Sequence, residues 1–440
     1  MRSEFLVEKS FSGLSSCCLA RRYCKVTQVH GYFIEATYMD SKVGEVAKVF
    51  NNDRELECEV VSISRESALL APLEMPIGVG VGNKVLYLDA YAEADFLQDP
   101  FSKIINGLGH DIAHQPSSAI SRGALSLNVE PVPVSLRTSV NTMTPTSIKL
   151  IDYLLPLGRG QKMGVFSGSG VGKSTLLNNL QKEVQADVKI IAMIGERSRE
   201  VVEFYEAYIG AGSHRDTFIV ASTSDESPMM KCRALKVALS YSKTFSDQGK
   251  QVLLIVDSMT RFAHALREVA ISRGELPIAR GYPTSVFNEL SKVVETCGNF
   301  QNGGSITGVM SILVDGDDEH EPISDYMRGI LDGHLLLDRR LSDRGLYPAI
   351  DILKSRSRVS DRVLNDKAQE IARNIKLIYS RYADAEDVIK TGIYVSGSNP
   401  DIDSTIRLKT LLDSELYSSG KTLSTATIHE VLQYTKNHHA

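Results

Sequence analysis

Residues 162–184, KMGVFSGSGVGKSTLLNNLQKEV, constrain the fold more than any other stretch of this chain. An apolar run typical of a buried strand is followed by a glycine-rich turn and then by a helical pattern. Glycines let the backbone curl so that its N–H groups point at phosphate oxygens, and the next helix adds the positive end of its dipole. The sequence therefore predicts a phosphate-binding loop made of Gly168, Ser169, Gly170, Val171, Gly172, Lys173, Ser174 and Thr175.

Two side chains of this loop carry chemistry. We expect the ammonium of Lys173 to bridge the outer phosphates of a nucleotide and the hydroxyl of Ser174 to ligate magnesium. Ser167 stands where the usual pattern has glycine, and a small residue is tolerated at that place. The alternative is a chance glycine-rich turn. The complete Gly-Lys-Ser-Thr ending, after a strand and before a helix, argues against it.

Short apolar runs alternate with helical stretches from about residue 100 to about residue 360. Strands that are apolar throughout are typical of parallel sheets that are covered on both faces. The pattern predicts an α/β P-loop NTPase core with a mainly parallel sheet and helices on both faces. The expected strands lie in KMGVF, KIIAMI, TFIVAS, QVLLIV and GVMSILV.

The two ends of the chain have other patterns. In ELECEVVSI, residues 55–63, apolar residues alternate with glutamates, as in a half-buried strand. Similar short runs before residue 90 predict a small N-terminal β-barrel domain. Residues 366–390, DKAQEIARNIKLIYSRYADAEDVIK, carry an apolar stripe at helical spacing. We therefore expect three domains: a barrel-like domain over 1–90, a RecA-like ATP-binding catalytic domain over 91–362 and a helical domain over 363–440.

Composition excludes several classes of protein. The 440 residues include 42% apolar and 23% charged residues, as in ordinary globular proteins, and the formal net charge of −5 argues against specific nucleic-acid binding. Residues 1–13, MRSEFLVEKSFSG, lack the apolar core of a secretory signal, and no stretch approaches the roughly 20 apolar residues that span a bilayer. We expect a cytoplasmic protein with reduced thiols at Cys17, Cys18, Cys24, Cys58, Cys232 and Cys297.

Two further carboxylates stand at the ends of predicted strands. QVLLIVD ends in Asp257, which is a Walker B arrangement for orienting a magnesium ion, although an Asp can also cap the next helix. IAMIGERSRE places Glu196 at the end of another strand, where a carboxylate can align an attacking water, with Arg197 beside it to hold nearby charge. A helix start that favours acids explains Glu196 and Glu200 equally well, so the residues alone leave both interpretations open.

A resemblance to a known family separates these interpretations. GRGQKMGVFSGSGVGKSTLL, IGERSREVVEF, LLIVDSMTRFAHALRE, ARGYPTSVF, LVDGDDEHEPISD, ILDGHLLLDRRL and YPAIDILKSRSRV follow one another in this order. Together they resemble the type III export ATPases, flagellar and injectisome, which are relatives of the catalytic subunit of rotary ATP synthases. The resemblance runs from about residue 100 to the C-terminus and implies ATP and Mg²⁺ as ligands. It also implies that Glu196 is the catalytic glutamate.

The same resemblance implies roles for three more residues. Tyr347 matches an adenine-stacking aromatic, and a core tyrosine is the alternative. Arg261 matches a phosphate-side arginine, and an ion-paired helix arginine is the alternative. Arg358 matches an arginine that a neighbouring subunit supplies to stabilise charge on the phosphates, and a surface arginine is the alternative.

Because Glu196 and Arg358 both occur in one chain, we expect a homo-hexamer with Arg358 acting in trans. The resemblance further implies a bacterial type III export motor, with the flagellar form favoured, that energises chaperone release, unfolding and export of protein substrates. The partners it implies are stalk and regulator proteins of the apparatus and chaperone–substrate complexes. It places the protein in the cytoplasm, peripherally at the inner face of the membrane below the export gate.

Three other functions remain to be weighed. A synthase-type subunit coupled to ion translocation has almost the same active site, but the short chain and the joint presence of Glu196 and Arg358 disfavour it. An RNA-dependent hexameric helicase needs an N-terminal fold with base-stacking aromatics. Tyr32, Phe33 and Tyr38 are present there, but no basic stripe accompanies them. A nucleotide-binding regulator without turnover does not need Glu196.

Overall fold

The computed structural model describes residues 22–51, 54–113, 122–208, 216–278, 280–314, 321–418 and 420–438. Cys17, Cys18 and residues 315–320 of the LVDGDDEHEPISD motif lie outside these ranges. The described residues divide into two units by their contacts. One holds the residues up to Glu93 with the segments Glu226–Met230 and Glu268–Leu276, and the other holds the rest.

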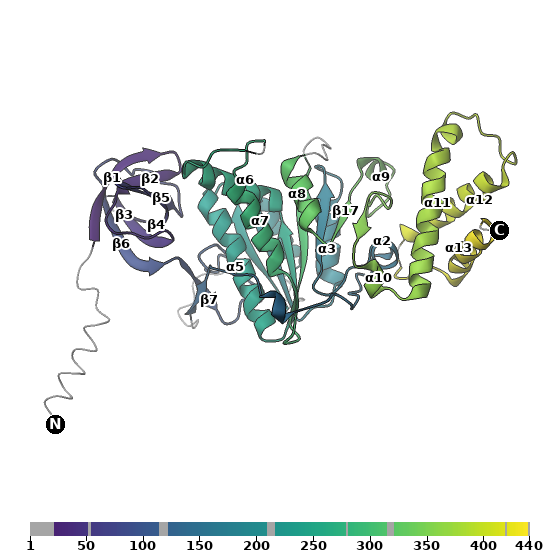
Figure 1. The fold of residues 1–440 in the computed structure, drawn as a ribbon, viewed down its shortest axis with the longest axis horizontal. Helices are drawn as coiled ribbons and strands as arrows, with labels where there is room; N and C mark the ends of the chain where they lie inside the picture. Colours follow the sequence, from purple (N-terminus) through teal and green to yellow (C-terminus); the bar gives the residue numbers. More distant parts are fainter. Residues whose placement is uncertain are drawn as a thin grey trace, which may run out of the picture. The chain divides into compact units, whose positions relative to one another are not determined.

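The first unit contains a closed antiparallel barrel, drawn in purple in Figure 1. Closure leaves no unpaired sheet edge among its strands. The expected strand over 55–63 is β4, with Leu56, Cys58 and Val60 buried, so the prediction of a barrel is confirmed. The strand order is β1-β2-β5-β4-β3-β6, with bounds β1 (Arg22–His30), β2 (Phe33–Thr37), β3 (Glu45–Asn51), β4 (Arg54–Ile63), β5 (Ser67–Pro72) and β6 (Lys84–Tyr91).

The second unit is built on a ten-stranded sheet whose central strands run parallel. The five predicted apolar runs are its strands β11, β12, β13, β14 and β16, which confirms the predicted fold class. The path through the sheet is β18-β17-β11-β16-β14-β12-β13-β8; off this path, β15 pairs with β16 and β10 pairs with β15. Their bounds are β8 (Ile104–Ile105), β10 (Arg137–Thr138), β11 (Lys162–Ser167), β12 (Val188–Glu196), β13 (Thr217–Thr223), β14 (Gln251–Asp257), β15 (Gly298–Phe300), β16 (Ser305–Leu313), β17 (Gly333–Leu336) and β18 (Arg356–Ser357). A separate ribbon pairs β7 (Glu93–Leu97) with β9 (Arg122–Ser126).

The direction of each crossover places the helices on the two faces of the sheet. Helices α3 (Lys173–Glu183) and α4 (Ser198–Tyr208) follow steps towards β13, whereas α5 (Pro228–Asp247), α6 (Met259–Ser272), α7 (Thr284–Thr296) and α8 (Pro322–Ile330) follow steps in the opposite direction. Since parallel crossovers are right-handed, the two groups cover opposite faces. Helices α5, α6 and α7 stand in front of the sheet in Figure 1. All functional loops at the carboxyl ends of the parallel strands therefore open on one edge of the sheet.

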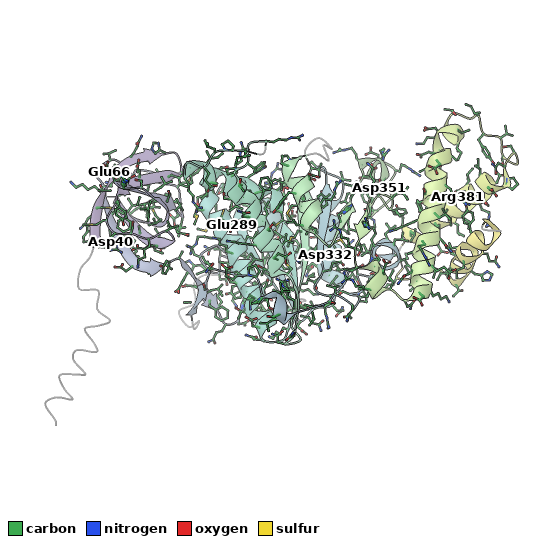
Figure 2. All side chains as sticks on the ribbon, in the orientation of Figure 1. Asp40, Glu66, Glu289, Asp332, Asp351 and Arg381 are labelled. Atoms are coloured by element: carbon green, nitrogen blue, oxygen red, sulfur yellow. The ribbon has the colours of Figure 1, made fainter. Side chains whose placement is uncertain are left out.

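The C-terminal helices pack on the same unit. The stripe of α11 buries Ile371, Ile375 and Ile378, and Asn365 caps the helix by accepting a hydrogen bond from the backbone N–H of Ala368 (2.9 Å). Figure 2 shows Arg381 on the same helix. The remaining helical segments are the 3-10 turn η1 (Val134–Leu136), α2 (Lys149–Leu154), α9 (Arg339–Asp343), α10 (Ser360–Val363), α11 (Asp366–Lys390), α12 (Pro400–Leu416) and α13 (Thr425–His438). Across the described ranges, no helix has the length and apolar character needed to cross a membrane.

We predict that Ile375→Ala destabilises the docking of the C-terminal helices. Ile375 is fully buried in the cluster that joins α11 to α2, so truncation leaves a cavity and lowers the free energy of unfolding by about 2–5 kcal/mol. The measurement is urea denaturation followed by circular dichroism. Ile393→Ala is the matched control, because Ile393 is 73% exposed and its truncation changes stability by less than about 0.5 kcal/mol. Equal effects of the two substitutions would contradict the assignment of this core.

Candidate functional site

The glycine-rich loop lies where the sequence predicted it, between β11 and α3. Gly170 and Gly172 have φ values of 77° and 97°, which side-chain-bearing residues rarely adopt. Gly172 is the N-cap residue of α3, so the first free N–H groups of that helix open at the loop. Ser167 ends β11 as a buried small residue. The backbone is therefore shaped to surround an anion at the positive end of a helix.

Three charged side chains meet beside this loop. The ammonium of Lys173 donates a hydrogen bond to Asp257 Oδ1 and lies 3.8 Å from Glu196 Oε1. The carboxylates come from the ends of β14 and β12, which are neighbours in the sheet. The side chains of Lys173, Asp257 and Glu196 are 13%, 12% and 3% exposed. Burial of this kind requires that the charges compensate one another, so the cluster holds the three groups in place.

The carboxylate of Asp257 and the hydroxyl of Ser174 fit a magnesium ion as donors. Both supply the oxygen donors that this ion prefers, and magnesium sites commonly use one or two protein groups together with phosphate oxygens and water. Asp257 Oδ1 is oriented by a hydrogen bond from the hydroxyl of Ser311 on β16 (2.6 Å). Ser311 was not among the predicted site residues. A serine in the otherwise apolar run GVMSILV is the signal that would have marked it.

Glu196 is a buried carboxylate whose surroundings shift its pKa. Its Oε1 is buried, with Arg261 Nε (3.2 Å) and Lys173 Nζ (3.8 Å) beside it as ion-pair partners. Burial, and next the negative charge of Asp257, raises the pKa of this carboxyl to about 7, while Lys173 and Arg261 act in the opposite direction. A base with a pKa near the operating pH is effective in proton transfer.

Arg261 lies on the Glu196 side of the cluster. Its Nε is 3.2 Å from Glu196 Oε1, and its Nη1 donates a hydrogen bond to the carbonyl of Gly195 (2.5 Å). Gly195 has a φ of 72°, and a Cβ at that position would lie 3.0 Å from Arg261 Cδ. The arginine is thus packed directly against the strand end that presents Glu196. The interpretation as an ion-paired helix arginine and the interpretation as a phosphate contact both fit this geometry.

Tyr347 lies on the outer side of the loop. The residue is 49% exposed, and its ring approaches Gly172 closely, since a Cβ on Gly172 would lie 3.3 Å from Tyr347 Cε1. Its hydroxyl contacts Ser342 Oγ at 2.8 Å. The guanidinium of Arg339, which was not predicted, donates to the carbonyl of Ser169 (2.9 Å). An exposed ring beside a phosphate-binding loop is available for stacking on a base.

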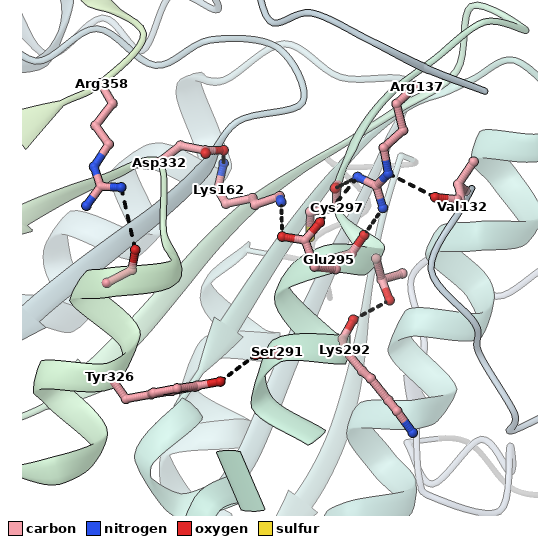
Figure 3. Close-up of polar contacts among 12 residues, drawn as sticks. Val132, Arg137, Lys162, Ser291, Lys292, Glu295, Cys297, Tyr326, Asp332 and Arg358 are labelled. Carbon is pink, nitrogen blue, oxygen red and sulfur yellow. Dashed lines mark hydrogen bonds and ion pairs between the residues drawn. The ribbon is translucent and has the colours of Figure 1, made fainter. Parts of the chain in front are cut away.

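Arg197 and Arg358 are not part of this cluster. Arg197 is 72% exposed and pairs with Glu200 (3.9 Å) on the first turn of α4. The backbone N–H of Arg358 donates to Asp332 at the start of β17, level with Lys162 at the start of β11. At about 3.3 Å per residue, the start of β11 at Lys162 lies roughly 16 Å from its loop end at Ser167. Figure 3 shows the Arg358 guanidinium turned to the end of α8, where it donates to the carbonyls of Arg328 (3.3 Å) and Gly329 (3.5 Å).

A cavity of about 480 Å³ adjoins the buried cluster. At its inner end it reaches Ser174 and Asp257, and its wall follows α4 outwards. The side chains along it become more exposed with distance from the cluster, from 12% for Asp257 to 39% for Glu200 and 63% for Glu203. The cavity therefore lies between α3 and α4, and the candidate site residues that line it are Ser174 and Asp257.

Comparison with known proteins places this geometry in a family. The model of the ATP synthase alpha/beta family nucleotide-binding domain matches residues 147–357, and that of the T3SS EscN ATPase C-terminal domain matches residues 364–416. The flagellum-specific ATP synthase of Borreliella burgdorferi is 39% identical over 383 residues, which are 87% of this chain and 88% of that protein. That of Salmonella typhimurium is 36% identical over 411 residues, covering 90% of this chain and 89% of that protein.

Two solved structures are similar over nearly their whole length. The assembled ATPase EscN from the enteropathogenic E. coli type III secretion system has a TM-score of 0.85 at 32% identity. EscN in complex with its central stalk EscO has a TM-score of 0.82 at 32% identity. Each similarity covers 93% of this chain and 99% of the other.

We predict that Lys173→Ala weakens nucleotide binding. The substitution removes the ammonium that faces the loop and leaves the buried carboxylate of Asp257 without its cationic partner, so that it repels the phosphates. We expect the dissociation constant of a fluorescent ATP analogue to rise by at least about tenfold, the loss of one charge-assisted contact. Lys182→Ala on the exposed side of the same helix is the control. Equal affinities for the wild type and Lys173→Ala would contradict the loop assignment.

Proposed function

This chain is a member of the type III export ATPase family and hydrolyses ATP, and we propose that the hydrolysis energises a bacterial type III protein export apparatus. The observation that carries the active-site assignment is the meeting of Lys173, Asp257 and Glu196 at the carboxyl ends of neighbouring parallel strands. This is the edge at which open α/β sheets bind ligands. We further propose that the domain boundaries are 1–90, 91–362 and 363–440.

In this proposal, the residues of the site have distinct roles in hydrolysis. The N–H groups of Gly168–Thr175 hold the phosphates, and Lys173 neutralises charge on the outer ones. Tyr347 stacks on the adenine. Glu196 accepts a hydrogen bond from the attacking water and takes its proton, while Arg261 holds the strand end that carries it and faces the terminal phosphate.

Magnesium, held by Ser174 and Asp257, would neutralise the charge that develops on the phosphate oxygens. The donor set supports this assignment, since a hydroxyl and a carboxylate lie at the loop and at the end of a nearby strand. Asp257 is released for this role when Lys173 moves to the phosphates.

We propose that Arg358 completes the site of a neighbouring copy in a homo-hexamer. Within its own chain it lies at the opposite ends of the strands from the loop, so it serves no phosphate there. Arginines supplied in trans are worth about three to five decades in rate. The similarity to assembled EscN supports a closed ring, in which each copy gives one arginine and receives one.

We propose more specifically that the export apparatus is that of the flagellum. Its support is the similarity to flagellum-specific ATP synthases and the segment YVSGSNPDIDSTI, residues 394–406. We propose a stalk protein in the ring, by analogy with EscN and EscO, together with regulator proteins and chaperone–substrate complexes whose release, unfolding and export the ATPase drives. The proposed place of action is the cytoplasmic face of the membrane, at the base of the export gate.

We predict that the pH profile of ATP hydrolysis has a descending limb on the acidic side of neutrality. Since burial raises the pKa of Glu196 to about 7, the base is ionised above this pH and protonated below it. The kcat/KM for Mg-ATP should therefore rise with pH up to about 7 and fall by about tenfold per unit below it. The measurement is steady-state hydrolysis at fixed free magnesium.

Glu196→Gln is the control for this limb. The amide cannot take a proton, so the variant should bind ATP with unchanged affinity, lose at least about 100-fold in kcat, and show no limb near pH 7 in its residual activity. Normal turnover in this variant would remove Glu196 from its role.

We predict that Arg358→Ala folds and binds ATP normally but hydrolyses it at least about 1,000-fold more slowly, even in assembled oligomers. The side chain is exposed, and its hydrogen-bond partners among the described residues, the carbonyl groups of Arg328 and Gly329 on α8, can be satisfied by water, so its loss leaves the core intact. Arg362→Ala, another exposed arginine close by, is the control. Full activity of Arg358→Ala would show that the arginine is a surface residue.

A further inference from the structure

Ser311 places a hydroxyl in a part of the sheet that is otherwise apolar. The residue is 0% exposed and lies on β16, between β11, which leads into the loop, and β14, which ends in Asp257. Because side chains alternate across a strand, Ser311 faces the same side of the sheet as the buried Val309. A hydroxyl in such surroundings costs free energy unless it is hydrogen-bonded, and the carboxylate of Asp257 supplies that bond.

Two donors share one oxygen of Asp257. Ser311 Oγ donates to Oδ1 (2.6 Å), and the ammonium of Lys173 donates to the same atom. Among the residues that the structure describes, no donor is bonded to Oδ2. Asp257 and Ser174 line one cavity. The carboxylate oxygen that remains for a metal ion in this cavity is therefore Oδ2.

Nucleotide binding affects these two donors differently. In the proposed mechanism Lys173 moves to the phosphates, so its bond to Oδ1 is lost when the site is loaded. Ser311 has a short side chain and lies in a strand that is paired with β11 on one side and β14 on the other. Its position is fixed by the sheet, so its bond to Oδ1 is the one that persists in the loaded site.

We propose that Ser311 is a positioning residue, which holds Oδ1 of Asp257 inwards after Lys173 has left and so keeps Oδ2 turned to the magnesium ion. This inference rests on the proposed magnesium site and adds the residue that orients its carboxylate. Hydrogen bonds to metal-binding groups commonly contribute a factor of about 10 to 100 to metal affinity. Without Ser311, the carboxylate is held by Lys173 in the empty site but is free to rotate in the loaded one.

The test is the affinity for Mn²⁺, used as a paramagnetic probe in place of magnesium, in the complex of the full-length chain with ADP. Free Mn²⁺ is counted from its electron paramagnetic resonance spectrum. Ser311→Ala should raise the dissociation constant of Mn²⁺ at least about tenfold. The same variant should bind a fluorescent ATP analogue as tightly as the wild type when no metal ion is present, because the loop and Lys173 are intact.

Ser305→Ala is the matched control. Ser305 is 1% exposed and lies on the same strand and the same face as Ser311, but six residues away, which is about 20 Å along the strand. Its substitution removes the same atom and should leave the affinity for Mn²⁺ unchanged. Ser311→Thr keeps the hydroxyl on a residue that suits a strand, and it should restore most of the affinity. Thermal melting followed by circular dichroism checks that each variant is folded.

Two results would overturn the role of Ser311. The first is an ADP complex of Ser311→Ala that binds Mn²⁺ as tightly as the wild type. The second is a loss that does not depend on the hydroxyl. Ser305→Ala would then weaken binding as much as Ser311→Ala, or Ser311→Thr would melt like the wild type and recover none of the affinity.

Asp257→Asn separates this inference from the proposed function. The substitution removes the charge from the proposed metal-binding group and should weaken Mn²⁺ binding at least as much as Ser311→Ala. Wild-type affinity in Asp257→Asn would remove Asp257 from the proposed magnesium site and overturn both proposals. A loss in Asp257→Asn with none in Ser311→Ala would overturn the role of Ser311 alone.

Discussion

The ammonium of Lys173, held between the carboxylates of Asp257 and Glu196, is the interaction on which the rest of the site depends. Two carboxylates at neighbouring strand ends repel each other and resist burial unless a cation lies between them. The lysine supplies that cation, and in the mechanism that we propose it is also the residue that moves to the phosphates. In that mechanism nucleotide binding changes the electrostatic surroundings of both carboxylates at once, which couples binding to the protonation state of Glu196.

The same sheet presents its two functional edges at opposite ends of its strands. The loop, Glu196 and Asp257 lie at the carboxyl ends, whereas Arg358 lies at the start of β17 beside the end of α8. If Arg358 has the role that we propose, the chain holds one half of a site at each edge. A closed ring is the simplest assembly that joins every loop to an arginine, because a head-to-tail interface repeats the same pairing at each contact.

The sequence predicted the parts that local patterns determine. Apolar runs located the five central strands, and alternation with glutamates located β4 in the barrel. The glycine-rich loop, Asp257 and Glu196 were found because each directly follows a strand whose apolar character is plain. Parallel strands bring such residues to one edge whatever the strand order, so their meeting needed no knowledge of the topology.

Contacts that depend on the strand order could not be predicted from the sequence. Ser311 orients Asp257 only because β16 lies between β11 and β14, and Arg339 reaches Ser169 only because β17 lies beside β11. The exposure of Arg197 and its pairing with Glu200 also follow from the way α4 begins, so its catalytic role stays a prediction. The edge position of β18, which turns two arginines outwards, could not be foreseen from a two-residue strand.

Mixing two inactive chains tests whether the site is shared between copies. A Glu196→Gln chain retains Arg358, and an Arg358→Ala chain retains Glu196, so a mixed ring contains interfaces with both residues intact. Hydrolysis should reappear when the two variants are combined at equal concentration, at about a quarter of the wild-type rate if assembly is random. Mixtures that stay as inactive as the separate variants, while sizing as mixed rings, would contradict an active site completed by Arg358 of a neighbouring copy.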